Sequence, residues 1–165
     1  MILEILKYPH PTLRKKSKAV KRVDDKIKKL IKNMIETMQA APGIGLAAPQ
    51  VGESVRVIVA DIGEGPFAIV NPKIKNKSGP TQIFEEGCLC LPGLVGPVER
   101  PSIVTVTGLD RNGQLITLDA EEFLATVLQH EIDHLEGKVF IDRIKDKSLI
   151  REVSRKEEIE NKGFI

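Results

Sequence analysis

The segment of residues 120–136 restricts the fold more than any other part of the sequence. Its first half carries apolar side chains at helical spacing, and its second half includes the run His-Glu-Ile-Asp-His at residues 130–134. A helix with this pattern is expected to be largely buried. Moving a polar group out of water without a partner costs about 2–7 kcal/mol. The chain must therefore fold around this helix and supply partners for its imidazoles and carboxylates.

The two histidines of this helix, His130 and His134, are four residues apart. At that spacing both imidazoles leave the same helix face and can bind one metal ion. Glu131 lies next to the first histidine, where its carboxylate can take a proton from water activated by the metal and pass it to a leaving group. The motif on a buried helix therefore favours a metal-dependent hydrolase over a chance match.

A third ligand is needed, because catalytic sites usually hold a metal by three protein groups and leave one position for water. The third histidine that metzincins carry would fall at residue 140, which is Phe140, and the glutamates after residue 150 lie in a charged segment expected to be exposed. His10 lies in a proline-rich segment and is expected to be structural or at the surface. A buried cysteine is more often a plain small hydrophobe, but a thiolate binds iron or zinc strongly. Cys88 is therefore the best remaining candidate.

The rest of the pattern predicts the elements that surround this helix. An amphipathic helix capped by Asp24 is expected at residues 24–40, and a charged helix at residues 147–162. Between them, β-branched or alternating residues predict strands at residues 55–60, 66–70, 81–86, 103–109 and 114–119. This order predicts an α+β fold, with antiparallel sheets around the HExxH helix and a further helix near each end of the chain. A length of 165 residues fits a single domain, residues 1–165.

Composition narrows the class of protein further. No apolar run reaches the roughly 20 residues that a membrane span needs, and the N-terminus lacks a signal-peptide pattern. We therefore expect a cytoplasmic protein with no membrane partner. The net charge of +2 gives no reason to expect direct binding of nucleic acid. The only two cysteines are separated by one residue, which favours ligand or reactive thiols over a disulfide.

Three segments of the chain resemble those of the peptide deformylase family. They are GIGLAAPQ at residues 43–50, EGCLCLP at residues 86–92 and HEIDH at residues 130–134, in the family's order. The N-terminal run ILKYPHPTLRKKSKAV is also similar to the opening segment of the family, so the resemblance covers about residues 2–143. It implies removal of the N-formyl group from the initiator methionine of new polypeptides, with release of formate.

The resemblance also implies the roles of individual residues. It implies metal ligation by Cys88, His130 and His134, general acid–base catalysis by Glu131, and oxyanion stabilisation by Gln50 and the backbone N–H of Leu89. The implied cofactor is one divalent metal ion, usually Fe²⁺ in this family, with Zn²⁺, Ni²⁺ or Co²⁺ as substitutes. The implied partners are N-formylmethionyl nascent polypeptides. Contact with the ribosome through the C-terminal segment is a further hypothesis, because a C-terminal helix helps some family members to dock there.

The methionine side chain of such a substrate needs an apolar pocket. The residues expected to bind substrate are Gly45, Ile44, Phe84, Phe123 and Val127, with Glu86 near the pocket entrance. The alternative for each apolar residue is a place in the ordinary core. Asp133 and Arg100 are expected either to pair and orient the helix or to form a plain surface ion pair.

Cys90 stands where the family usually has Ser. If residues 88 and 90 share one face of a regular strand, a second thiol lies near the proposed ligand. This predicts raised sensitivity to oxidation, through a Cys88–Cys90 link or a sulfenic acid. The alternative is an inert thiol packed in the strand.

Two other functions fit the helix motif alone. One is a general metallopeptidase, which would act on unformylated peptides. The other is a non-catalytic metal-binding domain, which needs neither Gln50 nor Glu131.

Overall fold

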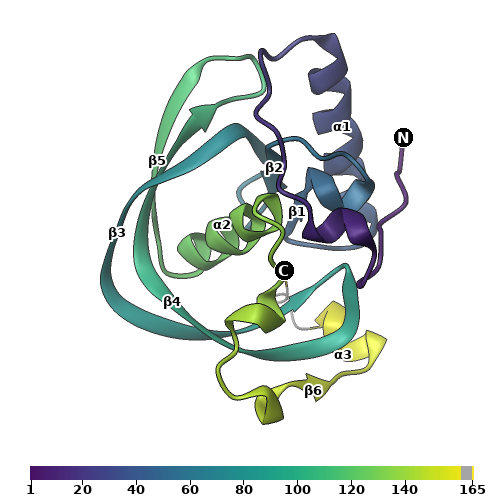
Figure 1. The fold of residues 1–165 in the computed structure, drawn as a ribbon, viewed down its shortest axis with the longest axis vertical. Helices are drawn as coiled ribbons and strands as arrows, with labels where there is room; N and C mark the ends of the chain where they lie inside the picture. Colours follow the sequence, from purple (N-terminus) through teal and green to yellow (C-terminus); the bar gives the residue numbers. More distant parts are fainter. Residues whose placement is uncertain (161–164) are drawn as a thin grey trace.

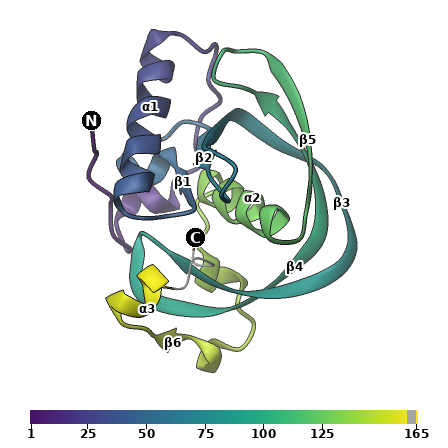
Figure 2. The same cartoon turned by 180° about the vertical axis from the view of Figure 1, so that it is seen from behind.

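The structure is a computed structural model that describes residues 1–160 and residue 165. Among these residues, one antiparallel sheet has the strand order β1-β2-β3-β4-β5, and a short strand β6 pairs with β4. Figures 1 and 2 show this sheet curving around helix α2, with α1 on the side of β1 and β2. The strands are β1 (Gly45–Ala47), β2 (Val57–Ala60), β3 (Phe67–Cys88), β4 (Leu91–Leu109), β5 (Leu115–Glu121) and β6 (Arg151–Glu152).

Helix α2 (Glu122–Leu135) is enclosed as its sequence requires, since every residue from Ala125 to Leu135 is buried. Its apolar side chains, among them Leu128 and Leu135, join one core cluster with Ile58 and Ile69 of the sheet. This leaves the ionisable side chains of the helix buried as well. The expected α+β class with antiparallel pairing is confirmed.

Helix α1 (Asp25–Ala40) covers the other side of β1 and β2. The Asp24 side chain accepts a hydrogen bond from the Ile27 amide at 3.0 Å, which gives the helix the predicted N-cap. Met34 and Met38 are fully buried in a cluster with residues of β1 and β2. Helix α1 thus covers a second core cluster, separate from the one that α2 forms with the sheet.

The strands differ from the predicted ones mainly in length. β3 unites the strands expected at residues 66–70 and 81–86. The polar residues between them also pair with β4. Register shifts interrupt the regular alternation of side chains along this part of β3. β3 and β4 form a long hairpin whose narrow turn holds residues 89 and 90, and Cys88 pairs with Leu91 across it. This turn is where the cysteine segment meets α2.

The prediction of a helix over residues 147–162 is wrong in its first half. A 3-10 turn, Lys147–Leu149, starts where the Asp146 side chain accepts hydrogen bonds from Ser148, and β6 then pairs with β4. Helix α3 covers only Arg155–Glu160, and the predicted residues 161 and 162 lie outside the described residues. Further 3-10 turns are η1 (Pro11–Arg14), η2 (Ala48–Val51) and η3 (Phe140–Arg143). No helix in the described ranges has the length and apolar character needed to cross a bilayer.

Candidate metal centre

Three donor atoms converge between α2 and the end of β3. The ligand atoms of Cys88, His130 and His134 lie within 4.8 Å of one another. The Cys88 Sγ is 3.3 Å from the His134 Nε2, and all three residues are buried. One thiol and two imidazoles at this separation are a donor set suited to iron or zinc.

Several buried polar atoms around the three donors have no hydrogen-bond partner within the part of the protein that the structure describes. Among the described residues, the buried His130 Nε2 and both Glu131 carboxylate oxygens have no hydrogen-bond partner. Leaving such atoms unpaired costs free energy, so an interior normally avoids them. A metal ion between the thiol and the imidazoles would use the His130 nitrogen, and a water molecule beside Glu131 would use its oxygens. The residues present therefore fit a metal site.

Metal binding here must displace protons. Burial raises the pKa of Cys88 to about 12, because the charged thiolate is disfavoured away from water. A metal ion binds the thiolate and releases the thiol proton. The metal affinity is therefore expected to fall as the pH falls.

Glu86 holds the first histidine in place. Its side chain is fully buried, and its Oε1 lies 2.8 Å from the His130 Nδ1. With the Nδ1–H donated to this carboxylate, the lone pair of Nε2 faces the other donors. The expectation that Glu86 lies near the entrance of a substrate pocket is wrong. Its position in β3 turns the carboxylate towards α2 instead.

Arg100 links the Glu86 carboxylate to helix α2. Its guanidinium donates to Glu86 at 2.7 and 3.0 Å, and to Asp133 at 3.0 Å. Arg143 also donates to Asp133, at 2.8 and 3.1 Å. Burial opposes ionisation of Glu86, but the hydrogen bonds from His130 and Arg100 prevail and lower its pKa. The Arg100–Asp133 pair is thus a buried contact, not a surface one.

Glu131 lies against the backbone of β1. Burial raises its pKa to about 7, so the carboxyl group can gain and lose a proton near neutral pH. A Cβ atom added at Gly45 would collide with the Glu131 carboxylate. Glycine is therefore needed at this close approach. Gly45 leaves the space that the Glu131 carboxylate occupies, in addition to any contact with substrate.

We expect Gly45→Ala to lower kcat by about 100-fold. The added methyl group displaces the Glu131 carboxylate, and a misplacement of about 1 Å at a reacting group can cost that much. The metal content should stay at one ion per chain, since Glu131 is not among the converging donors. Gly43→Ala is the matched control. Its Cβ would meet mainly the Leu89 Cδ1 at 2.7 Å, the movable end of a side chain. Equal loss in both variants would contradict a specific role for Gly45.

Gln50 and Leu89 flank the thiol. Gln50 is buried in η2, where its Oε1 accepts from the Ala47 amide at 2.8 Å and its Nε2 donates to the Cys88 Sγ at 3.3 Å. This arrangement holds the amide N–H group beside the donors. Leu89 lies in the β3–β4 turn, and its carbonyl accepts from the Lys7 Nζ at 3.3 Å.

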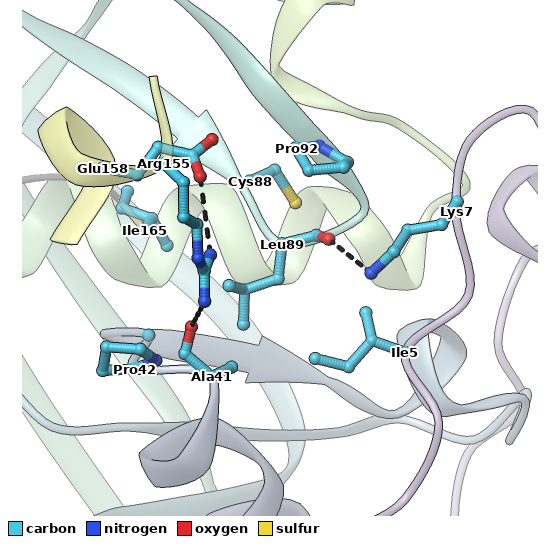
Figure 3. Close-up of a pocket in the computed structure, with 11 residues that line it drawn as sticks. Ile5, Lys7, Ala41, Pro42, Cys88, Leu89, Pro92, Arg155, Glu158 and Ile165 are labelled. Atoms are coloured by element: carbon cyan, nitrogen blue, oxygen red, sulfur yellow. Dashed lines mark hydrogen bonds and ion pairs between the residues drawn. The ribbon is translucent and has the colours of Figure 1, made fainter. Parts of the chain in front are cut away.

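Four apolar residues expected around the methionine side chain lie together. Val127 is buried in a small cluster, with Ile44 and Phe123 packed against it. The rings of Phe84 and Phe123 meet edge to face, with centroids 5.5 Å apart. Figure 3 shows the neighbouring cavity beside Cys88 and Leu89. Its walls also include residues that no sequence pattern places there, namely Ile5, Lys7, Arg155, Glu158 and Ile165.

The second thiol lies close to the first. The Sγ atoms of Cys88 and Cys90 are 3.1 Å apart, and Cys90 is fully buried. They are not on one face of a regular strand, because Cys88 ends β3 and Cys90 belongs to the turn. The turn itself brings the two thiols together.

We expect Cys90→Ser to slow inactivation in air severalfold. Removing the second thiol prevents oxidation of the pair to a link that would take Cys88 from the metal. The measurement is the loss of activity and of bound metal with time in aerated buffer, with an anaerobic sample as control. An unchanged rate would show that Cys90 is an inert substitute.

Known proteins share this arrangement of the chain. A family model described as polypeptide deformylase matches residues 2–149. The peptide deformylase of Alkaliphilus metalliredigens is 52% identical over 134 residues, which cover 81% of this chain and 90% of that protein. The peptide deformylase of Clostridium botulinum is 48% identical over 143 residues, covering 87% of this chain and 97% of that one.

Solved structures agree with these relatives. The crystal structure of peptide deformylase from Thermotoga maritima matches with a TM-score of 0.86 and 42% identity, over 88% of this chain and 99% of that one. The structure from Ehrlichia chaffeensis in complex with actinonin matches with a TM-score of 0.86 and 40% identity, over 89% of this chain and 91% of that one.

Proposed function

The chain belongs to the peptide deformylase family of metal-dependent hydrolases, and on that premise we propose that Cys88, His130 and His134 hold the metal ion at which the N-formyl group is removed. The observation that carries the proposal is the convergence of these donors within 4.8 Å, beside a buried and unpartnered Glu131. A bound divalent metal ion would acidify a water molecule and polarise the formyl carbonyl.

The side chains around this centre supply the proton transfers. Glu131 accepts a proton from the attacking water as the water oxygen bonds to the formyl carbon. The Gln50 amide and the backbone N–H of Leu89 donate hydrogen bonds to the formyl oxygen as its negative charge grows, and one such donor is worth about 3 kcal/mol in comparable sites. Glu131 then gives the proton to the amine nitrogen as the C–N bond breaks, leaving formate and a free amino group. The pKa of about 7 suits both transfers.

We propose that the methionine side chain enters the apolar cluster that Val127 forms with Ile44 and Phe123, with Phe84 at its edge and Gly45 on the substrate path. Val127 and Phe123 belong to α2, the helix that holds Glu131, and Ile44 directly precedes Gly45 of β1. A side chain bound there would place the substrate's first amide beside Glu131.

We propose Fe²⁺ as the physiological metal, as the resemblance to the family implies. Zn²⁺, Ni²⁺ or Co²⁺ can substitute for it, because a thiolate with two imidazoles accepts each of these ions. We further propose one catalytic domain over residues 1–165, acting in the cytoplasm on N-formylmethionyl nascent polypeptides. Contact with the ribosome stays a prediction for the C-terminal segment.

The test is a formate-release assay run anaerobically with Fe²⁺ and then with Zn²⁺. The substrates are a formyl-methionyl tripeptide, its acetylated analogue and the unmodified tripeptide. Release of formate from the first substrate is expected, with no acetate from the second and no cleavage of the third. Cleavage of the unmodified peptide without formate release would favour a general metallopeptidase. A protein that binds metal and acts on none of the three would be a non-catalytic metal-binding domain.

A further inference from the structure

Ile165 occupies an unexpected position for a residue in the charged C-terminal segment. Its side chain is only 3% exposed. It is buried in one cluster with Ala60 and Val127, against which Ile44 and Phe123 pack. These are the residues to which we assign the methionine side chain. We infer that Ile165 fills the substrate's methionine pocket and so competes with the formyl-peptide, an inference that rests on the proposed function.

The free space beside the donors supports this inference. The cavity lined by Cys88, Leu89 and Ile165 measures only about 140 Å³. Sites for small ligands usually offer about 300–1,000 Å³. Figure 3 shows Ile165 and Arg155 on the side of this cavity opposite Lys7, where they take up room that a peptide would need. The residues of the chain itself therefore narrow the site.

A few polar contacts hold residues 153–158 beside the cavity. The Arg155 Nη2 donates to the Ala41 carbonyl at 3.1 Å, and the Gly93 amide donates to the Glu158 carboxylate. The Val153 amide donates to the Gly93 carbonyl at 2.9 Å. The Arg155 side chain is 61% exposed, so water competes for its contacts. Residues held by so few contacts can detach while the sheet and α2 stay folded.

The chemistry of the side chain makes Ile165 a competitor and not a permanent plug. Isoleucine and methionine bury similar apolar groups, but isoleucine is branched at Cβ whereas methionine is long and flexible. Substrate also gains contacts at the metal and at the donors of Gln50 and Leu89. The apparent affinity for substrate is then reduced by the fraction of molecules in which the pocket is open.

The experiment compares Ile165→Asp and Ile165→Ala with the wild-type protein. If the pocket is filled in about nine-tenths of the molecules, the Asp variant lowers KM about tenfold with kcat unchanged. The affinity for the unformylated methionyl tripeptide, measured by calorimetry, should rise by the same factor. Arg155→Ala should shift both quantities in the same direction by less. Leu149→Ala is the control, because Leu149 is 52% exposed elsewhere on the C-terminal segment.

Unchanged KM and tripeptide affinity in the Ile165 variants would overturn the inference. If the midpoint of thermal unfolding also fell by several degrees, Ile165 would be an ordinary core residue. A wild-type protein that releases no formate would instead overturn the proposed function. Calorimetry separates the two failures, because it reports on the pocket without turnover.

Discussion

Replacing Glu131 by Gln is expected to lower kcat/KM by about two to four orders of magnitude while one metal ion stays bound. The amide has nearly the same shape as the carboxyl group but cannot carry the proton from water to the amine. Metal analysis and the formate-release assay on the same sample measure both quantities. Loss of the metal together with activity would show that Glu131 is a ligand and not the acid–base group.

The same substitution is expected to stabilise the metal-free protein. The folded state raises the pKa of Glu131 from 4.5 to about 7 by burial, so stability is lost as the pH rises through this interval and the buried group must ionise. At pH 8 this cost is about 3 kcal/mol, which Gln removes. Below about pH 4 the two proteins should differ little, because both side chains are then neutral. Denaturant unfolding at the two pH values measures the difference.

A Gln variant that is less stable at pH 8 than the wild-type protein would contradict this prediction. It would mean that the Glu131 carboxylate has a favourable partner even without metal. Gly45→Ala is a useful comparison, because it disturbs the position of the same carboxylate without removing its charge.

Replacing Arg100 by Met is expected to lower the free energy of unfolding by about 3–5 kcal/mol. Arg100 lies between Glu86 and Asp133, and its loss leaves two buried carboxylates without their shared partner. The metal affinity should also fall by about 10–100-fold, because Glu86 would no longer be fixed against His130. Denaturant unfolding of the metal-free protein and a metal titration measure the two effects.

The matched control is Arg151→Met. Arg151 also pairs with a glutamate, Glu85, but on the surface, where its side chain is 51% exposed. An exposed pair is worth about 0–1 kcal/mol, so stability and metal affinity should barely change. Adding Glu86→Gln and Asp133→Asn to Arg100→Met should restore part of the stability without restoring the metal affinity. Equal effects of the two arginine replacements would contradict the role given to Arg100.

The sequence predicts the elements that depend on residues close together in the chain. The helical spacing of apolar side chains predicts both α1 and α2, and Asp24 caps α1 as expected. The sequence also predicts Cys88 as the third ligand beside His130 and His134. The turn that brings the thiol to the helix, however, depends on pairing between β3 and β4.

Glu86 could have been placed correctly from the sequence. Side chains two apart in a strand face the same side, so Glu86 and Cys88 share a face, and an acid beside a metal-binding histidine is a common support. Other features depend on contacts between distant segments. Residues 151 and 152 leave the predicted helix because they pair with β4, and no local pattern indicates that Ile165 reaches Val127.

X-ray absorption of the zinc-loaded protein tests the assignment of the ligands most directly. One sulfur at about 2.3 Å and two nitrogens at about 2.0–2.1 Å are expected around the metal. The sulfur should vanish in Cys88→Ala and persist in Cys90→Ala. Two sulfurs in the wild-type protein, or a sulfur that survives in Cys88→Ala, would contradict a site made by Cys88, His130 and His134.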